Sequence, residues 1–476
     1  MSVQEKTRGL LARIRNGRPM STRQQFSLTA WLSMPAILAQ FSSILMQYID
    51  ASMVGSLGAA PSAAIGIVST TIWLFGGLLV SCSSGFSVQV AHLVGADDFR
   101  GARNVFRQGL VSALLFSGVL AVVGCALSGF LPRWLGGADE IIDDAAAYFL
   151  IFSLCVPFLQ LEILAAGVLR CSGNMLVPSM LNVLMCVFDV IFNFLFIFPT
   201  TTYDVLGLSV TVPGADLGVI GAGLGTAVAE MLTALLMMWF AAVRSREMRL
   251  AGTRRDDGGV WRPTKRVLRK ALHIGMPISC ERAVMCGAQI TSTAIVAPLG
   301  TYAIAANTLA ITAESLCYMP GYGIGEAATT LVGQSFGAKR PALAWSFSKI
   351  TLWLGIGVMT LMGVVMFFGA EGMIGFMTPV DEVREMGSMA LKIEAFAEPM
   401  FAASIICYSI FVGAGDTLVP SLMNLGSIWA VRITLAALLA PRYGLNGVWV
   451  AMAVELTFRG LIMLYRLLRK KWLQVS

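Results

Sequence analysis

Long apolar segments separated by short polar stretches cover most of the chain. A helix needs about 20 mainly apolar residues to cross a bilayer. Twelve segments meet that requirement, at residues 27–54, 62–94, 105–131, 145–169, 176–198, 217–243, 273–297, 302–335, 343–369, 387–412, 418–440 and 445–467. None of them alternates apolar and polar positions with a period of two, so they do not read as strands. The pattern predicts an all-α polytopic membrane protein with 12 transmembrane helices.

The sequence of the first half recurs in the second half. A constant shift of 242 residues places Met34-Pro35 on Met276-Pro277, Leu57-Gly58 on Leu299-Gly300, and Leu176-Val177-Pro178-Ser179 on Leu418-Val419-Pro420-Ser421. Such self-similarity indicates an internal duplication. Because each copy holds six spans, an even number, both copies cross the membrane in the same sense. Parallel repeats of this kind occur in alternating-access transporters, with the ligand site between the repeats.

The polar stretches divide the chain into lobes, tails and a linker. We expect a basic N-terminal tail over 1–26, a first six-helix lobe over 27–243 and an inter-lobe linker over 244–272. A second six-helix lobe over 273–467 and a C-terminal tail over 468–476 complete the chain.

Composition supports the membrane assignment. The chain is 57% hydrophobic and 13% charged, whereas a soluble chain has about 45–50% apolar and about 25% charged residues. Nine cysteines without a CxxC pair and only two histidines give no disulfide framework or zinc pattern. No GxSxG, HExxH or Ser/His/Asp cluster occurs. We therefore expect neither an enzyme nor a resident cofactor, and no obligate protein partner is evident.

The basic residues predict the orientation in the membrane. If the N-terminus is cytoplasmic, 27 of the 34 basic residues fall in cytoplasmic segments and three in the opposite loops. The positive-inside rule then places both termini in the cytoplasm of a plasma or inner membrane. The basic residues are spread over all the inner loops, so the net charge of +7 gives no reason to expect nucleic acid as a partner.

Acidic residues inside the spans are the strongest functional signal. A carboxylate deep in a bilayer costs at least about 2.5–3.5 kcal/mol, so such groups face an interior or a water-filled cavity. Asp50 and Asp189 stand out in the first lobe, and Asn193 lies one turn after Asp189 on the same helix face. Their hard oxygen ligands suit Na⁺ or a proton relay. Further candidates for substrate or proton binding are Glu162, Glu230, Glu281, Glu314 and Glu398.

Several short stretches, in order along the chain, resemble the multidrug and toxic compound extrusion (MATE) family. They are Tyr48–Gly55, Glu314–Gly321, Ala327–Gln334, Gly413–Thr417 with Pro420, and Gly447–Met452. The resemblance implies two six-helix lobes that form a V. It also implies export of organic, often cationic, compounds against inward H⁺ or Na⁺.

The resemblance carries the family's first-span acidic position over to Asp50. The family's fifth span often reads Asn-x-x-x-Asp, whereas this chain has Asp189-x-x-x-Asn193, with the two polar types exchanged. An acidic residue after the seventh-span proline occurs in some members. Here Glu281 follows Pro277 by one turn rather than two.

The sequence favours a secondary active antiporter with a small organic substrate, embedded in membrane lipid. In this hypothesis Asp50, Asp189 and Asn193 bind the coupling cation, H⁺ or Na⁺. A flippase for a lipid-linked or other amphiphilic substrate is the first alternative, although ten in-span acids against four in-span basic residues favour a cationic cargo. A membrane-embedded lipid-modifying enzyme is the second alternative.

Overall fold

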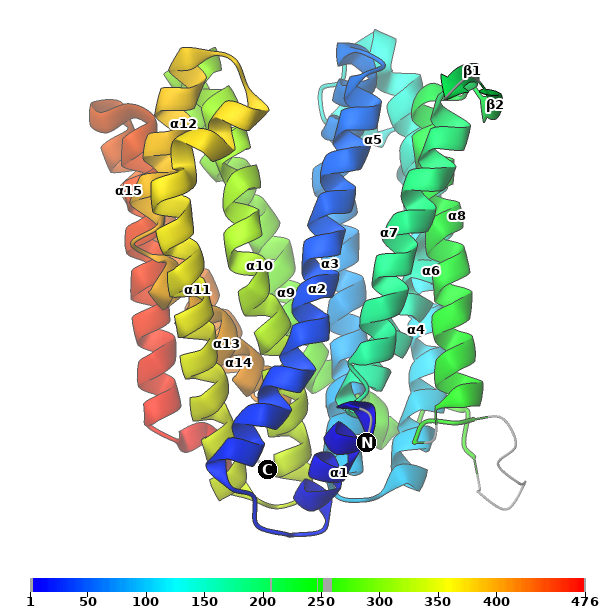
Figure 1. Ribbon diagram of the computed structural model, residues 1–476, viewed down its shortest axis with the longest axis vertical. Helices are drawn as coiled ribbons and strands as arrows, with labels where there is room; N and C mark the ends of the chain where they lie inside the picture. The colour runs from blue at the N-terminus through cyan, green and yellow to red at the C-terminus, as the bar shows by residue number, and fades with distance from the viewer. Residues whose placement is uncertain (1–2, 206–207, 246, 251–258, 475–476) are drawn as a thin grey trace.

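The computed structural model describes residues 3–205, 208–245, 247–250 and 259–474. Two lobes of long helices stand side by side and diverge toward one end (Figure 1). The first lobe contains α2 (Thr22–Gly55), α3 (Ala59–Gly95), α4 (Phe99–Leu127), α6 (Asp139–Cys171), α7 (Leu176–Ile197) and α8 (Gly218–Trp239). Helix α8 continues as a π-helical turn, Phe240–Arg244, and a short helix α5 (Leu131–Trp134) connects α4 to α6.

The second lobe repeats this arrangement with more interruptions. Its elements are α9 (Lys265–Val296), a 3₁₀ turn (Ala297–Leu299), α10 (Thr301–Gly337), α11 (Pro341–Met377), α12 (Asp381–Glu394), α13 (Glu398–Ala414), α14 (Leu418–Ser427), a π segment (Ile428–Ile433), α15 (Thr434–Leu468) and a final 3₁₀ turn (Lys471–Gln474). Gly444 has a non-helical backbone inside α15, so this element is two spans joined at a kink. With α12 and α13 forming one broken span, each lobe has six spans.

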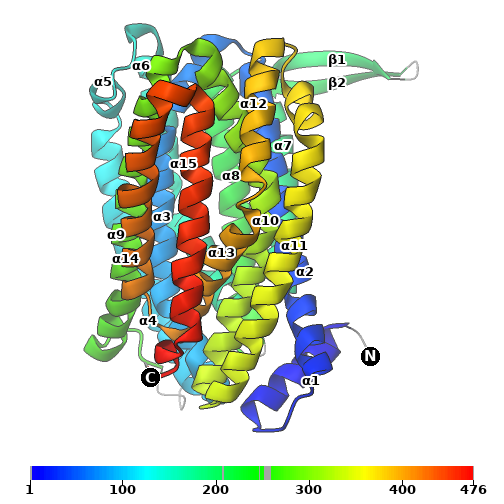
Figure 2. The same cartoon turned by 90° about the vertical axis from the view of Figure 1, so that its left-hand side faces the viewer.

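Different parts of the chain lie at the two ends of the molecule. An antiparallel hairpin of β1 (Pro199–Val205) and β2 (Leu208–Ala215) projects from one end, together with α5 and α12 (Figures 1 and 2). We call this the hairpin end. Both chain termini lie at the opposite end, which we call the terminal end.

The internal duplication is visible in the backbone. Left-handed φ angles occur at Gly58 and Gly300, at Asp97 and Lys339, and at Gly173 and Gly415. Each pair is separated by the same 242 residues that align the sequence halves. Glycine tolerates this conformation without steric cost, so the repeated turns are built into the repeated sequence.

Three features depart from the pattern of uninterrupted spans. The span expected over 387–412 is broken by a 60° bend between Glu394 and Glu398. The basic N-terminal segment contains a helix, α1 (Val3–Arg15). The stretch between α7 and α8 forms the β-hairpin, which the search for 20-residue apolar runs could not detect. Among the described residues, eight helices pass a length and hydropathy test for spanning a membrane, or nine with the bent pair. The 51-residue element Leu418–Leu468 counts once in that test although it contains two spans.

The lobes contact each other near the terminal end. Gly95 and Gly337, which are repeat counterparts, let α3 and α10 approach closely. A β-carbon on Gly95 would lie 2.0 Å from the Gln334 carbonyl oxygen, and one on Gly337 would lie 1.8 Å from that of His92. His92 Nε2 also lies 2.9 Å from the Gly413 carbonyl oxygen. Any larger residue at these two glycines would separate the lobes.

Candidate functional site

Three polar side chains meet in the interior of the first lobe, toward the hairpin end. Asp50 comes from α2, and Asp189 and Asn193 come from α7. The Asn193 amide donates to Asp50 Oδ1 at 3.0 Å and to Asp189 Oδ2 at 3.1 Å. Asp189 and Asn193 are fully buried, whereas Asp50 is partly exposed. The Asn193 amide of α7 therefore connects α7 to α2, because it donates to one carboxylate on each helix.

A close approach by helix α8 helps to position this cluster. A β-carbon on Gly225 would lie 2.1 Å from Asn193 Oδ1 and 2.8 Å from the Asn193 backbone nitrogen. Only glycine leaves room there, so α8 forms a wall of the cluster. Tyr148 of α6 packs against Val54 and Ile197 on the hairpin side.

The cluster has the chemistry of a small monovalent-cation site. Asp189 Oδ1 and Asn193 Oδ1 are buried and have no hydrogen-bond partner within the described part of the chain. Two carboxylates this close repel each other in a low-dielectric interior unless a cation or a proton compensates one charge. Carboxylate and amide oxygens are ligands for hard cations such as Na⁺. The arrangement thus fits either a shared proton or a bound Na⁺.

A second pair of acids lies deeper in the same lobe. Glu162 of α6 and Glu230 of α8 are within hydrogen-bonding reach of each other. With the Asn182 amide turned so that its nitrogen faces the Pro178 carbonyl, as the surrounding acceptors favour, it donates to Glu162 Oε1 at 3.2 Å. The structure therefore places Glu162 and Glu230 together, but not in the cluster of Asp50 and Asp189.

In the second lobe, Glu281 is held by hydrogen bonds rather than by its neighbour Arg282. Tyr408 donates to Glu281 Oε2 at 2.6 Å and Asn424 donates to Oε1 at 2.7 Å. Arg282 points to the other lobe, where a β-carbon on Gly77 would lie 3.1 Å from Arg282 Cβ. Adjacent residues on a helix project about 100° apart, which explains why this pair does not interact.

The other second-lobe acids form two sets with different partners. Glu314, Glu394 and Glu398 lie near one another at the break between α12 and α13, and all three are buried. Neither carboxylate oxygen of Glu394 or Glu398 has a hydrogen-bond partner among the described residues. Glu455 is instead neutralised, because Arg432 and Arg459 both pair with it, at 2.7 and 3.1 Å.

Sequence reasoning did not identify the partners that complete these sites. Tyr408 lies in an apolar run, and nothing in its spacing marks it. Gly225, in contrast, belongs to a Gly-x-Gly-x-Gly stretch over residues 221–225, whose spacing is typical of close helix packing. Asn424 could have been found, because it is the repeat counterpart of Asn182 and each of the two amides faces a buried glutamate. No group of three or more His, Cys, Asp or Glu side chains suited to a metal ion occurs in the described ranges.

Comparison with known proteins places the chain in a family. The model of the MatE family matches residues 35–195 and again residues 277–438. The two matches begin 242 residues apart, which independently reproduces the internal duplication. Together they cover well over half of the chain.

Named relatives agree along nearly the whole length. The chain is 23% identical to a probable multidrug resistance protein NorM of Thermotoga maritima, over 93% of this chain and 92% of the relative. It is 25% identical to a probable NorM of Idiomarina loihiensis, over 94% and 95% of the two chains.

Solved structures show the same fold. A crystal structure of a MATE protein in complex with MaL6 superimposes with a TM-score of 0.86 at 18% identity, over 98% of this chain and 99% of that one. A MATE transporter of Vibrio cholerae superimposes with a TM-score of 0.83 at 19% identity, over 98% of both chains. This chain is therefore a membrane protein with the V-shaped two-lobe fold, and it belongs to the MATE family of transporters.

Proposed function

We propose that this protein is a secondary active antiporter that exports organic compounds, cationic or amphipathic in character, in exchange for inward H⁺ or Na⁺. The cluster of Asp50, Asp189 and Asn193 carries this proposal. Asp189 and Asn193 are fully buried, the cluster contains two carboxylates, and no basic side chain pairs with either of them in the described part of the chain. A site of this kind can bind and release a small cation.

Helix α2 connects the proposed cation site to the contact between the lobes. Its hairpin-end half carries Asp50, while its terminal-end half packs against α10, where a β-carbon on Gly323 would lie 2.7 Å from the Ile37 nitrogen. A cation drives transport only if it binds one conformation better than the other. Binding at Asp50 would draw α2 toward α7 and α8, and this displacement would change the packing of α2 on the second lobe.

The proposed orientation has the terminal end in the cytoplasm of a plasma or inner membrane. Positively charged loops favour the cytoplasmic side. The hairpin-end elements α5 and α12 contain only Arg133, Arg384 and Lys392 as basic residues, whereas the linker and both tails are rich in them. In this orientation the lobes are in contact on the cytoplasmic side, as expected for an outward-facing state.

The substrate class is inferred from charge and from the relatives. The relatives are named multidrug resistance proteins. In the second lobe, Glu281, Glu314 and Glu398 form no ion pair with a basic side chain among the described residues. They are therefore our candidates for binding a cationic substrate or a proton, together with Glu162 and Glu230 of the first lobe.

The test is uptake of an organic cation into inverted vesicles, in which export from the cell becomes movement into the lumen, under an imposed pH or Na⁺ gradient. We expect one gradient to drive this uptake in the wild type, and Asp50→Asn and Asp189→Asn to reduce it to the level of vesicles without the protein. Asp139→Asn is the matched control, because Asp139 is an exposed acid at the start of α6. Full transport in both cluster variants at wild-type membrane abundance would refute the proposed cation site.

A flippase remains the competing function, and charge discriminates between the two. A solved structure of a Pyrococcus furiosus transporter with this fold is described as having a binding pocket of reversed polarity that suggests a different function, at a TM-score of 0.85. In this chain the in-span residues Arg432 and Arg459 are occupied by Glu455. They are therefore poorly placed to bind a phosphate group. Transbilayer movement of a labelled phospholipid, without ion-driven cation efflux, would favour the flippase.

A further inference from the structure

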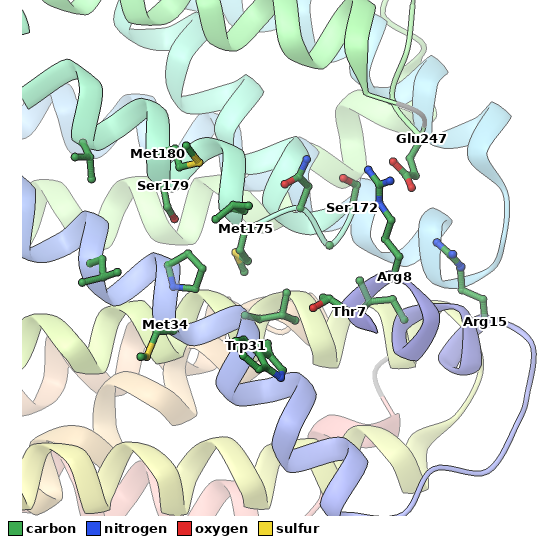
Figure 3. A pocket seen from close by; sticks show the side chains of 18 residues that line it. Thr7, Arg8, Arg15, Trp31, Met34, Ser172, Met175, Ser179, Met180 and Glu247 are labelled. Carbon is green, nitrogen blue, oxygen red and sulfur yellow. The ribbon is translucent and has the colours of Figure 1, made fainter. Parts of the chain in front are cut away.

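A cavity outside the proposed transport site opens between α1, α2 and α7 at the terminal end. Its volume is about 500 Å³, within the range of about 300–1,000 Å³ that is typical of ligand pockets. Figure 3 shows the side chains that line it. None of the acids discussed above contributes to it, so it is separate from both lobes' polar clusters.

The cavity has an apolar part and a charged part. Trp31 and Met34 of α2 and Met180 of α7 line the apolar part, and Met34 and Met180 are 65% and 62% exposed. Little protein covers these two side chains, so the cavity is open along α2 and α7. Arg8 and Arg15 of α1 lie together with Glu247 at the other end (Figure 3).

The charged side chains of the cavity indicate which kind of ligand it binds. The lining of the cavity holds two guanidinium groups, those of Arg8 and Arg15, and one carboxylate, that of Glu247. Arg15 pairs with Asp97 at 3.7 Å and lies over the Phe99 ring. Arg8 is exposed and forms no ion pair within the described ranges. An amphiphile with an anionic head and an apolar tail satisfies both parts of the cavity.

The position of the cavity fits a membrane lipid. Trp31 is 44% exposed at the rim, and tryptophan is enriched where a membrane meets water. If the terminal end is cytoplasmic, as the proposed function requires, the cavity lies at the leaflet that carries anionic lipids, which attract basic segments by about 1 kcal/mol per Lys or Arg.

We propose that the cavity between α1, α2 and α7 binds an anionic phospholipid of the cytoplasmic leaflet, with the phosphate at Arg8 and an acyl chain along Trp31, Met34 and Met180. The inference rests on the orientation given under the proposed function. In this site the lipid lies beside α1, and α1 contacts both lobes.

A lipid bound beside α1 would affect the contact between the lobes, because α1 packs against both of them. Leu11 and Ile14 are buried in a cluster that includes Leu32 of the first lobe and Leu331 of the second. Arg340 of the second lobe donates to the Arg13 and Ile14 carbonyl oxygens at 3.0 and 3.3 Å. A lipid that holds α1 in place would therefore favour the state in which the lobes are closed at the cytoplasmic side.

Binding is tested on the purified full-length protein in neutral detergent, by native mass spectrometry with added dioleoylphosphatidylglycerol or dioleoylphosphatidylcholine. We expect the anionic lipid to bind more tightly than the zwitterionic one. Arg8→Gln should weaken phosphatidylglycerol binding about fivefold. Arg18→Gln is the control, because Arg18 is exposed, carries the same charge and does not line the cavity. Equal losses in both variants would show that general surface charge attracts the lipid and would overturn the site.

The apolar part is tested with a bulky side chain. Val183→Trp places an indole in the cavity and should weaken binding about tenfold by displacing methylene groups of the acyl chain. Val187→Trp, one turn further along α7, is the control, because Val187 is lipid-exposed and outside the lining. Unchanged binding in Val183→Trp would overturn the proposal, as would displacement of the lipid by ethidium or equally tight binding of free glycerol phosphate. These measurements do not depend on transport, so they can fail while the antiporter proposal stands.

Discussion

The two lobes share one framework but treat their buried acids differently. In the first lobe, Asp50 and Asp189 both accept from the Asn193 amide and pair with no basic side chain in the part of the chain that the structure describes. In the second lobe, Glu455 is enclosed by Arg432, Arg459 and Ser427. Within the described residues, the duplicated helices thus support two carboxylates without a basic partner in the first lobe. In the second lobe they support a closed ion-pair network around Glu455, beside Glu394 and Glu398, whose carboxylate oxygens have no hydrogen-bond partner in the described ranges.

This difference distinguishes acids that can exchange a cation from acids that stabilise the fold. A buried carboxylate that has no basic partner needs a mobile cation or a proton to balance its charge. A carboxylate paired with two arginines needs neither. Asn182 and Asn424 illustrate the shared framework, since they are repeat counterparts. Asn182 faces Glu162 of the fourth span, and Asn424 faces Glu281 of the seventh. The asparagine position is repeated in both lobes, but the glutamate that it faces lies on a different span of each lobe.

The largest effect is expected on breaking the second-lobe ion-pair network. Glu455→Gln leaves two arginines without their counter-charge, and the Arg459 side chain is almost fully buried. The free energy of unfolding should fall by about 3–5 kcal/mol, measured by denaturant titration in detergent. Glu394→Gln is the matched control, because both Glu394 oxygens lack a partner in the described structure. It should cost little, and an equal loss in both variants would contradict the distinction.

The next effect is expected on the wall of the first-lobe cluster. Gly225→Ala places a methyl group 2.1 Å from Asn193 Oδ1. Overpacking of this kind costs about 1–3 kcal/mol, and the displaced amide should uncouple efflux from the ion gradient. Thermal unfolding and vesicle efflux measure the two effects. Gly118→Ala in α4 is the control, since no atom lies within 4 Å of a β-carbon there. Wild-type coupling in Gly225→Ala would show that the cluster tolerates displacement.

A smaller effect is expected at Glu281. Tyr408→Phe removes the donor at 2.6 Å but leaves the Asn424 amide in place. The loss of stability should be about 1.5 kcal/mol, as for a hydrogen bond to a charged group. Because Glu281 is a candidate for substrate binding, the drug concentration for half-maximal efflux should change while the ion dependence stays the same. A changed ion dependence would instead place Glu281 with the cation site.

The smallest effect is expected at the contact between the lobes. Arg170 of α6 pairs with Glu326 of α10, and both side chains are partly exposed. Such pairs contribute up to about 1 kcal/mol, so Arg170→Gln should leave the protein folded but increase opening at the terminal end. Distances between spin labels on the two lobes measure this. Arg384→Gln, which breaks an exposed pair with Asp381 within α12, should leave them unchanged.

Much of the architecture could be predicted from the chain because the membrane imposes it. Hydrocarbon thickness sets the length of each span, and repeated Pro, Gly and Asn positions reveal the duplication. The bend between α12 and α13 could not be predicted. The bend lies just before Pro399, which is in the first turn of α13, and proline interrupts the helical hydrogen bonds. Its repeat counterpart Pro157 lies inside the continuous helix α6, so the proline alone does not decide whether the helix breaks.

By itself, the sequence determined the spans, the parallel repeat, the family and the set of buried acids, because these follow from hydrophobicity and spacing along one chain. The tertiary structure decided which acids meet. Asp50 and Asn193 lie 143 positions apart, and Arg432 reaches Glu455 rather than Glu398. Contacts between helices depend on how helix faces pack, and each span could face many neighbours. That choice is made by the close packing of many side chains at once, which local spacing does not encode.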